Sequence, residues 1–308
     1  MLTTTAIFLF KPMHNDFFLW RQNALARVEA ALGGFLTLDA APRLGEAMRY
    51  ATLGGGKRIR ALLCLATAEA LGGHAEAALR AACALEMIHA YSLVHDDMPC
   101  MDNDSLRRGK PTVHIAFGEA VALLAGDTLQ ARAFEVLTPA SHAVPAPLQA
   151  ALCRLLAAAS GQTGMCGGQA IDLLSVGKAL TQAELENMHR LKTGALLEAA
   201  VMMGAACASD ASEHTRNHLQ SYARHLGLAF QVMDDVLDCT ADSATLGKTA
   251  GKDADNDKPT YVSLMGLDAA RAYAHNLHAQ ALAALNAANI TNTAYLQALA
   301  GSVVERAA

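Results

Sequence analysis

Residues 93–104 read LVHDDMPCMDND, so four carboxylates fall within nine residues at the end of an apolar helical stretch. Residues 234–238 read DDVLD and again follow an apolar stretch. The C-terminus of a helix carries negative partial charge, so acids gathered there require a positive partner. Asp234 and Asp238 are four residues apart and share a helical face. Because unpaired acids are costly in apolar surroundings, the two clusters predict a cation site rather than two solvated helix ends.

Mg²⁺ suits such a site, because it prefers carboxylate oxygens and is commonly shared with substrate phosphates. Basic residues recur beside both clusters and after a glycine turn at residues 54–56. They are Lys57, Arg58, Arg60, Arg107, Arg108, Lys110, Lys192, Lys248, Lys252 and Lys258. His89, seven residues before Asp96, lies on nearly the same helical face. Any one of these groups alone is typical of a solvated surface, but together they favour a diphosphate site.

The composition predicts an all-α fold. Alanine and leucine dominate the chain of 308 residues, and prolines number only 8. Both dominant residue types lose little entropy in a helix. The absence of a low-complexity linker favours a single-domain bundle of about ten helices. Helices are expected near residues 22–38, 57–72, 75–98, 112–137, 147–160, 182–207, 212–240, 259–286 and 292–306.

Charge and cysteine usage narrow the class of protein. A formal charge of −5 with only 17% charged residues disfavours disorder and gives no basic excess for nucleic-acid binding. No apolar run approaches the roughly 20 residues of a membrane span. The 7 cysteines contain no CxxC pair, which predicts free thiols in a reducing compartment. We therefore expect a cytoplasmic protein.

Several motifs resemble the short-chain trans-polyprenyl diphosphate synthases, and most closely the bacterial type of farnesyl diphosphate synthase. The resemblance covers about residues 44–259 and continues more weakly to the end. Its marks are GGGKRIR (54–60), HAYSLVHDDMPCMDNDSLRRGKPTVH (89–114), MCGGQAIDL (165–173), HRLKTGALL (189–197), GLAFQVMDDVLD (227–238) and TLGK (245–248). Residues 1–20 match nothing in this pattern, so we expect an N-terminal extension there and a synthase domain over 21–308.

The resemblance implies the isoprenoid synthase fold, in which all-α subunits surround a deep apolar cavity and form homodimers. It also implies a transferase that condenses isopentenyl diphosphate head to tail with dimethylallyl or geranyl diphosphate. The products would be farnesyl diphosphate and diphosphate, and the reaction would depend on Mg²⁺. Three ions are expected with substrate bound.

The resemblance further implies roles for individual residues. Two Mg²⁺ would be held by Asp96, Asp97 and Asp102, and the third by Asp234, Asp235 and Asp238. Lys192 would act in catalysis with these acids. The allylic diphosphate would be held by Arg107, Lys192, Thr193, Gln231, Lys248 and Lys258. The diphosphate of isopentenyl diphosphate would be held by Lys57, Arg60, His89 and Arg108. The segment 249–257 is acidic and matches loosely, which weakens the assignments of Lys248 and Lys258.

Product length is a separate question. Tyr91 and Ser92 lie five and four residues before Asp96, where members of this family form the cavity floor. A bulky aromatic there, together with the longer DDxxxxD spacing, resembles enzymes that stop at fifteen carbons. A geranylgeranyl or geranyl diphosphate synthase of the same fold is the alternative. Tyr91 is also compatible with an ordinary core aromatic.

A rival interpretation comes from a different chemistry. Glu86 and His89, and likewise Glu186 and His189, form two Glu-x-x-His motifs, as in ferritin-like di-iron bundles. The nearby Lys192 would crowd such a centre, and both aspartate clusters would be idle. Two further alternatives keep the synthase fold: a non-catalytic partner subunit, which tends to lose one acidic cluster, and a terpene cyclase, which would not need the isopentenyl-binding cations.

Overall fold

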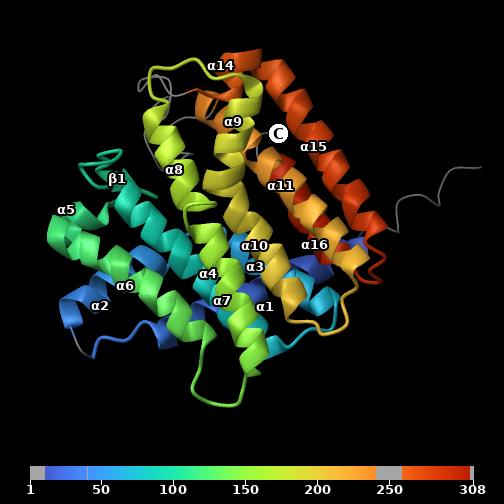
Figure 1. Ribbon diagram of the computed structural model, residues 1–308, viewed down its shortest axis with the longest axis horizontal. Helices are drawn as coiled ribbons and strands as arrows, with labels where there is room; N and C mark the ends of the chain where they lie inside the picture. The colour runs from blue at the N-terminus through green and yellow to red at the C-terminus, as the bar shows by residue number, and fades with distance from the viewer. Residues whose placement is uncertain (1–10, 40, 241–258, 306–308) are drawn as a thin grey trace, which may run out of the picture.

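The computed structural model describes residues 11–39, 41–240 and 259–305, with side chains described from residue 16 onward. These segments form a bundle of helices with one short hairpin, which confirms the all-α prediction (Figure 1). The helices are α1 (Lys11–Phe35), α2 (Pro42–Thr52), α3 (Ile59–Ala70), α4 (Ala75–Asp96), α5 (Val113–Phe117), α6 (Glu119–Leu137), α7 (Ala146–Ser160), α8 (Met165–Leu174), α9 (Gln182–His189), the π-helix η1 (Arg190–Gly194), α10 (Ala195–Ala206), α11 (Glu213–Thr240), α14 (Tyr261–Met265), α15 (Leu267–Ala287) and α16 (Ala294–Val304). The hairpin pairs β1 (Leu106–Arg107) with β2 (Lys110–Pro111) in antiparallel fashion.

Glycines divide two of the expected helices. Gly118 has φ 89° and separates α5 from α6, and Gly266 has φ 84° and separates α14 from α15. Glycine adopts this backbone conformation at no steric cost, whereas other residues rarely do. Helices α2 and α8 were not among the expected ranges. Helix α2 begins at Pro42, whose fixed φ suits the first turn of a helix.

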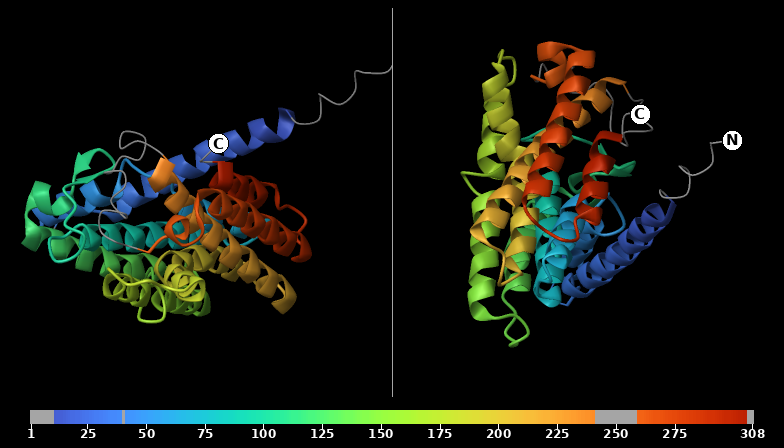
Figure 2. Two further views of the ribbon diagram at one scale, coloured as in Figure 1. Left: turned by 90° about the horizontal axis from the view of Figure 1, so that it is seen from above. Right: turned by 90° about the vertical axis from the view of Figure 1, so that its right-hand side faces the viewer.

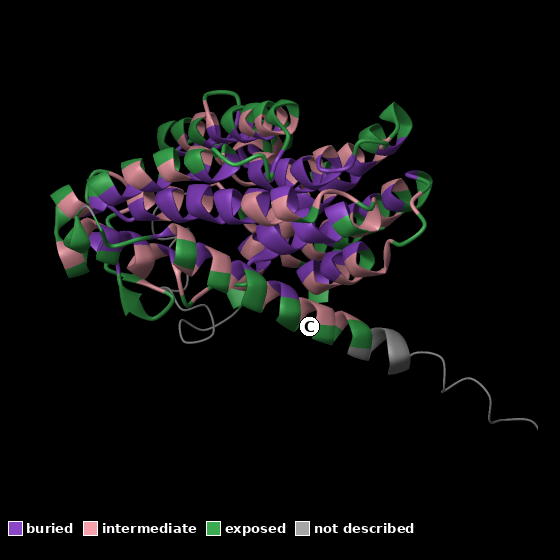
Figure 3. Cartoon of the chain, turned by 90° about the horizontal axis from the view of Figure 1, so that it is seen from below, coloured by how far each residue is buried: buried purple, intermediate pink, exposed green. Residues whose placement is uncertain are grey.

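Helix α4 lies at the centre of the bundle. It contacts α3, α6, α7 and α10 and is apolar around most of its circumference, as expected of a fully buried helix. By length and composition it is the one described helix that could span a membrane, but 72% of its most apolar window is buried inside the bundle. Figure 3 shows the buried residues running through the middle helices, with exposed residues on the outer ones. The core therefore accounts for the hydrophobicity of α4.

Helix α1 lies along the outside of the bundle, and its N-terminal part extends beyond it (Figure 2). Val28 and Leu32 are fully buried against the core. Nearer the N-terminus, Trp20 stacks on Tyr295 of α16 with ring centroids 4.4 Å apart. The boundary predicted at residue 20 therefore falls inside a continuous helix that packs on the last helix of the chain.

A buried ion pair joins the start of α3 to the middle of α4. Arg58 Nη1 lies 3.2 Å from Glu86 Oε2, and both side chains are only 3% exposed. Glu86 also accepts a hydrogen bond from the backbone N–H of Ala61, and Arg58 donates to Glu29 and to the carbonyl of Thr52. The pair thus anchors the loop that follows the glycine turn.

We expect Glu86→Ala to reduce the free energy of unfolding by about 1–3 kcal/mol, because the buried Arg58 guanidinium loses one of its two carboxylate partners and the backbone N–H of Ala61 loses its acceptor. The matched control is Glu76→Ala, which removes a more exposed carboxylate paired with Arg80 on the same helix and should cost at most about 0.5 kcal/mol. Urea unfolding followed by circular dichroism measures both. Equal losses for the two variants would contradict an anchoring role for Glu86.

Candidate active site

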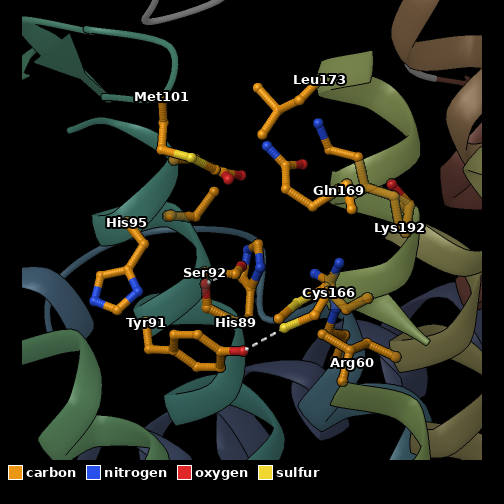
Figure 4. A pocket seen from close by; sticks show the side chains of 16 residues that line it. Arg60, His89, Tyr91, Ser92, His95, Met101, Cys166, Gln169, Leu173 and Lys192 are labelled. Atoms are coloured by element: carbon orange, nitrogen blue, oxygen red, sulfur yellow. Dashed lines mark hydrogen bonds between the residues drawn. The ribbon is translucent and has the colours of Figure 1, made fainter. Parts of the chain in front are cut away.

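A cavity of about 340 Å³ lies between α4, α8 and η1. Its lining comprises Arg60, His89, Tyr91, Ser92, Leu93, His95, Asp96, Met101, Met165, Cys166, Gln169, Ala170, Leu173, Lys192, Thr193 and Leu196. In Figure 4, Met101, Leu173 and Lys192 surround its upper part, whereas Tyr91 and Cys166 lie at its lower part. The lining thus carries charged side chains beside the end of α4, and it contains both polar and apolar side chains elsewhere.

The first acidic cluster is shaped by the turn that follows α4. Asp102 donates its backbone N–H to the carbonyl of Asp96 at 2.9 Å, and Asp104 donates to the carbonyl of Asp97 at 3.1 Å. These bonds fold the chain back, so that Asp102 lies beside the last turn of the helix. Asp96 is half-buried in the cavity wall. Burial, opposed by Lys192 and assisted by Asp102, raises its pKa to about 6. An additional cation there would relieve this unfavourable charge.

The side chain of Asp97 points in a different direction from that of Asp96. Its carboxylate is buried and accepts bonds from Arg107 Nε at 2.9 Å and Nη2 at 2.6 Å. Burial raises its pKa although Arg107 opposes the shift. Both residues line a smaller cavity of about 90 Å³, which shares Leu93 with the first. The structure therefore places the Asp97 carboxylate and the Arg107 guanidinium together, although the sequence predicted separate roles in metal and diphosphate binding.

The second acidic cluster occupies the end of α11 and is linked to η1 by side-chain hydrogen bonds. Thr193 donates to Gln231 Oε1 at 3.0 Å, and Gln231 Nε2 donates to Asp235 Oδ1 at 2.9 Å. The other oxygen of Asp235 accepts the backbone N–H of Tyr261 at 2.9 Å. Asp235 and Asp238 are buried, whereas Asp234 is half-exposed. These bonds fix Thr193, Gln231 and Asp235 relative to one another.

The four residues predicted to hold isopentenyl diphosphate are brought together. Lys57, Arg60, His89 and Arg108 all line one cavity of about 460 Å³ beside the glycine turn. Arg60 and His89 also line the first cavity, so the two adjoin. Burial lowers the pKa of Arg60, His89 and Arg108, and neighbouring arginines add to the shift. Because these positive charges lie close together, binding of an anion between them would be favourable.

The glycine turn makes room for one of these cations. A Cβ on Gly55 would lie 3.2 Å from Arg108 Nη1, and one on Gly56 would lie 2.9 Å from Arg108 Nη2. Gly56 also has φ 86°, which other residues rarely adopt. The turn therefore lets the Arg108 guanidinium lie directly against the backbone.

Lys192 and Thr193 are carried by η1, a π-helical turn of the kind often found at functional sites. Lys192 Nζ lies 2.5 Å from Asp172 Oδ2 of α8. A Cβ on Gly168 would lie 2.5 Å from the Cα of Lys192, so α8 approaches η1 closely at this point. Close packing and an ion pair thus fix the position of Lys192.

Sequence reasoning gave no role to Asp172, Gln169 or Cys166. All three belong to the stretch MCGGQAIDL, which was quoted as a family mark. Among the described residues, the buried amide group of Gln169 has no hydrogen-bond partner, and Figure 4 shows its side chain in the upper part of the cavity. Their spacing could have identified them, because residues 166, 169 and 172 are three apart and residues three or four apart share a helical face.

Other predicted residues have simpler outcomes. Ser92 lines the cavity and donates its hydroxyl to the carbonyl of His89. Lys248 and Lys258 lie outside the described residues. Asp234, Asp235 and Asp238 are absent from the described lining of the first cavity.

The two Glu-x-x-His motifs are engaged in other contacts. Glu86 is held by Arg58, as described above. Glu186 accepts hydrogen bonds from Tyr273 and Gln182. Among the described residues, no three His, Cys, Asp or Glu side chains are grouped closely enough to hold a metal ion by themselves. The carboxylates required for a di-iron centre are therefore not gathered in this part of the chain.

We expect the Asp96 carboxyl of the metal-free protein to titrate near pH 6, because burial disfavours its charged form. By linkage, stability falls as the pH rises from about 4 to about 6, because in this range the carboxyl ionises in the unfolded state and stays protonated in the folded one. Adding Mg²⁺ and diphosphate should lower the midpoint, because the cation favours the carboxylate. Carbon-13 NMR of aspartate-labelled protein measures the titration, and Asp96→Asn identifies the signal. A midpoint near 4 without metal would contradict the expected burial.

Comparison with known proteins agrees with these observations. Residues 41–298 match the profile of the polyprenyl synthetase family. A probable farnesyl diphosphate synthase from Sinorhizobium fredii is 52% identical over 268 residues, which cover 85% of this chain and 80% of that protein. The large subunit 1 of the chloroplastic heterodimeric geranylgeranyl pyrophosphate synthase from Arabidopsis thaliana is 44% identical over 301 residues, covering 96% and 81%. An apo crystal structure of an FPP/GFPP synthase from Zymomonas mobilis has a TM-score of 0.82 at 40% identity, covering 94% and 99%. The fold is therefore that of the isoprenoid synthases, and the chain belongs to the polyprenyl synthetase family.

Proposed function

We propose that this protein is a Mg²⁺-dependent prenyltransferase that condenses isopentenyl diphosphate with dimethylallyl and geranyl diphosphates to give farnesyl diphosphate. One observation carries the proposal: two adjoining cavities share Arg60 and His89 in their walls. The first also contains Asp96 and Lys192, and the second also contains Lys57 and Arg108. This arrangement suits two diphosphates held side by side. Family membership and relatives named as farnesyl diphosphate synthases support it.

The residues present suit Mg²⁺. Asp96 is a half-buried acid whose pKa is raised, and Asp102 lies beside it. A site with few protein ligands is typical of Mg²⁺ bound together with substrate phosphates. We therefore assign Asp96, Asp97 and Asp102 to two ions and Asp234, Asp235 and Asp238 to a third. Bound Mg²⁺ would neutralise negative charge on the departing diphosphate.

The chain's own residues would perform the remaining tasks. Lys192, positioned by Asp172, would bind the allylic diphosphate together with Thr193 and Gln231. Arg107, oriented by Asp97, would bind the same group, and so would Lys248 and Lys258. Lys57, Arg60, His89 and Arg108 would hold isopentenyl diphosphate so that its double bond faces the allylic carbon. Holding two reactants in this way replaces much of the entropic cost of their encounter.

Excluding water would protect the allylic cation that forms when the carbon–oxygen bond breaks. Met165 and Leu196 are buried in the cavity wall, and Met101 and Leu173 lie around its upper part. An apolar wall of this kind strengthens electrostatic interactions inside the site and limits hydrolysis of a reactive intermediate. The proton lost on condensation would leave with the diphosphate.

Farnesyl rather than geranylgeranyl diphosphate is proposed as the main product because the bulky Tyr91 lies at the lower part of the cavity. Both acidic clusters are present, which favours a catalytic subunit over a non-catalytic partner. Because isopentenyl-binding cations are gathered, condensation is preferred to terpene cyclisation.

We also propose a homodimer in the cytoplasm. Ile115, Leu123 and Leu124 are large apolar residues exposed on α5 and α6, where a second subunit could cover them. Among the described residues no disulfide joins the cysteines, as suits a reducing compartment.

A product assay tests the function directly. Purified protein is incubated with isopentenyl diphosphate and either dimethylallyl or geranyl diphosphate, with Mg²⁺ or with a chelator. We expect a fifteen-carbon product with Mg²⁺ and at least about a hundredfold loss of rate with the chelator, because charge on the leaving group is then not neutralised. Chromatography of the dephosphorylated products gives the chain lengths. Absence of product with both primers in Mg²⁺ would refute the proposed activity.

The position of η1 gives a further prediction. In Gly168→Ala the added methyl group must displace Lys192, and a misplacement of this kind should lower kcat/KM by about a hundredfold. Gly34→Ala is the matched control, because nothing lies within 4 Å of a Cβ at this helical site, and its rate should equal that of the parent protein. Steady-state isopentenyl incorporation measures both, and circular dichroism checks the fold. A Gly168→Ala variant with full activity would show that η1 tolerates the displacement.

A further inference from the structure

Two side chains from different helices meet across the lower part of the first cavity. The hydroxyl of Tyr91 on α4 lies 3.2 Å from Sγ of Cys166 on α8. Figure 4 shows the two side chains pointing toward each other, with the contact between them drawn as a dashed line. Both residues line the cavity. The contact therefore closes the space between two helices that are otherwise separated by the cavity.

Several contacts fix the Tyr91 side of this closure. The ring is 6% exposed and meets the His95 ring edge-on, with centroids 5.6 Å apart. His95 is itself held by the carbonyl of Leu123 on α6, 3.1 Å from its Nε2. Burial raises the pKa of Tyr91, the contact with Cys166 raises it further, and Gln130 opposes the shift. Tyr91 therefore remains a neutral phenol that can donate its proton to the sulfur.

The Cys166 side is fixed by backbone packing. Cys166 lies in the first turn of α8, two residues before Gly168, whose backbone packs against Lys192 of η1. Its neighbour Met165 is buried in the same cavity wall. This packing holds the backbone of α8 against η1, and the exposed Cys166 side chain extends from that backbone to the Tyr91 hydroxyl.

We propose that Cys166 is a specificity-determining residue, whose thiol holds the Tyr91 ring across the cavity and so limits the length of the isoprenoid chain. The inference rests on the proposed function and extends it to a residue of α8. Loss of the thiol removes a bulky atom and leaves the Tyr91 hydroxyl without this partner. The ring can then change rotamer, and a longer chain can pass.

Four single variants and one double variant separate volume from hydrogen bonding. Cys166→Ala should raise the ratio of twenty-carbon to fifteen-carbon product by at least about fivefold, the factor expected when one ordinary hydrogen bond is lost. Cys166→Ser should change the ratio less, because its hydroxyl can still bond Tyr91. Cys166→Leu should favour ten-carbon product from dimethylallyl diphosphate, because it narrows the cavity. Tyr91→Phe should give the same product distribution as Cys166→Ala. The double variant Tyr91→Phe/Cys166→Ala should make no longer products than either single variant, because both substitutions remove the same bond.

Two readouts keep the outcomes distinct. Total isopentenyl incorporation reports the activity, and chromatography reports the chain lengths. Cys153→Ala is the control, because this cysteine on α7 does not line the cavity; its product distribution should match the parent protein. Tyr91→Ala should lengthen the product most.

If the parent protein makes no product, the proposed function fails. If it makes product but Cys166→Ala and Cys166→Leu leave the distribution unchanged, the role of Cys166 is refuted.

Discussion

The ion pair between Arg58 and Glu86 holds the loop on which one of the two adjoining cavities is built. Both charges are removed from water, so they persist because each satisfies the other, because Arg58 also pairs with Glu29, and because Glu86 accepts from the backbone of α3. Arg58 itself has φ 51°, which the pair must hold in place. Lys57 and Arg60 flank it in sequence and therefore reach the cavity from a fixed backbone. The apolar helix α4 thus positions cations through a charge buried in its middle and acids through the residues at its end.

Charge is distributed unevenly around the site. Asp97 is matched by Arg107 and Asp172 by Lys192, each at hydrogen-bonding distance. Asp96 keeps a raised pKa, and the arginines around His89 repel one another. The first group of charges positions side chains. The second group is poised for ligands of opposite charge, because metal ions and diphosphates would supply what the protein leaves unbalanced.

Both acidic clusters could be located from the sequence because their spacing is local, and the family resemblance grouped Lys57, Arg60, His89 and Arg108, which line one cavity in the structure. The all-α fold followed from composition, and glycine clusters marked several of the breaks between helices, whereas α2 and α8 were missed. The division at Gly118 was missed because the sequence on either side is equally helical. The inward orientation of Asp97 and the contact of Cys166 with Tyr91 depend on which helix faces which. Such tertiary contacts cannot be predicted from the spacing of residues along the sequence.

The π-helical turn also affects the helices on either side of it. A π turn contains one residue more than an α turn, so α9 is rotated by about 100° relative to α10 from where an uninterrupted α-helix would place it. That rotation allows His189 to stack on Tyr261 of α14, with ring centroids 5.6 Å apart, while Lys192 three residues later meets α8. Removal of a single residue from 190–194 would therefore act as a change of register: α9 would present a different face to α14, and the hydrogen bond from Tyr273 to Glu186 would be lost with it.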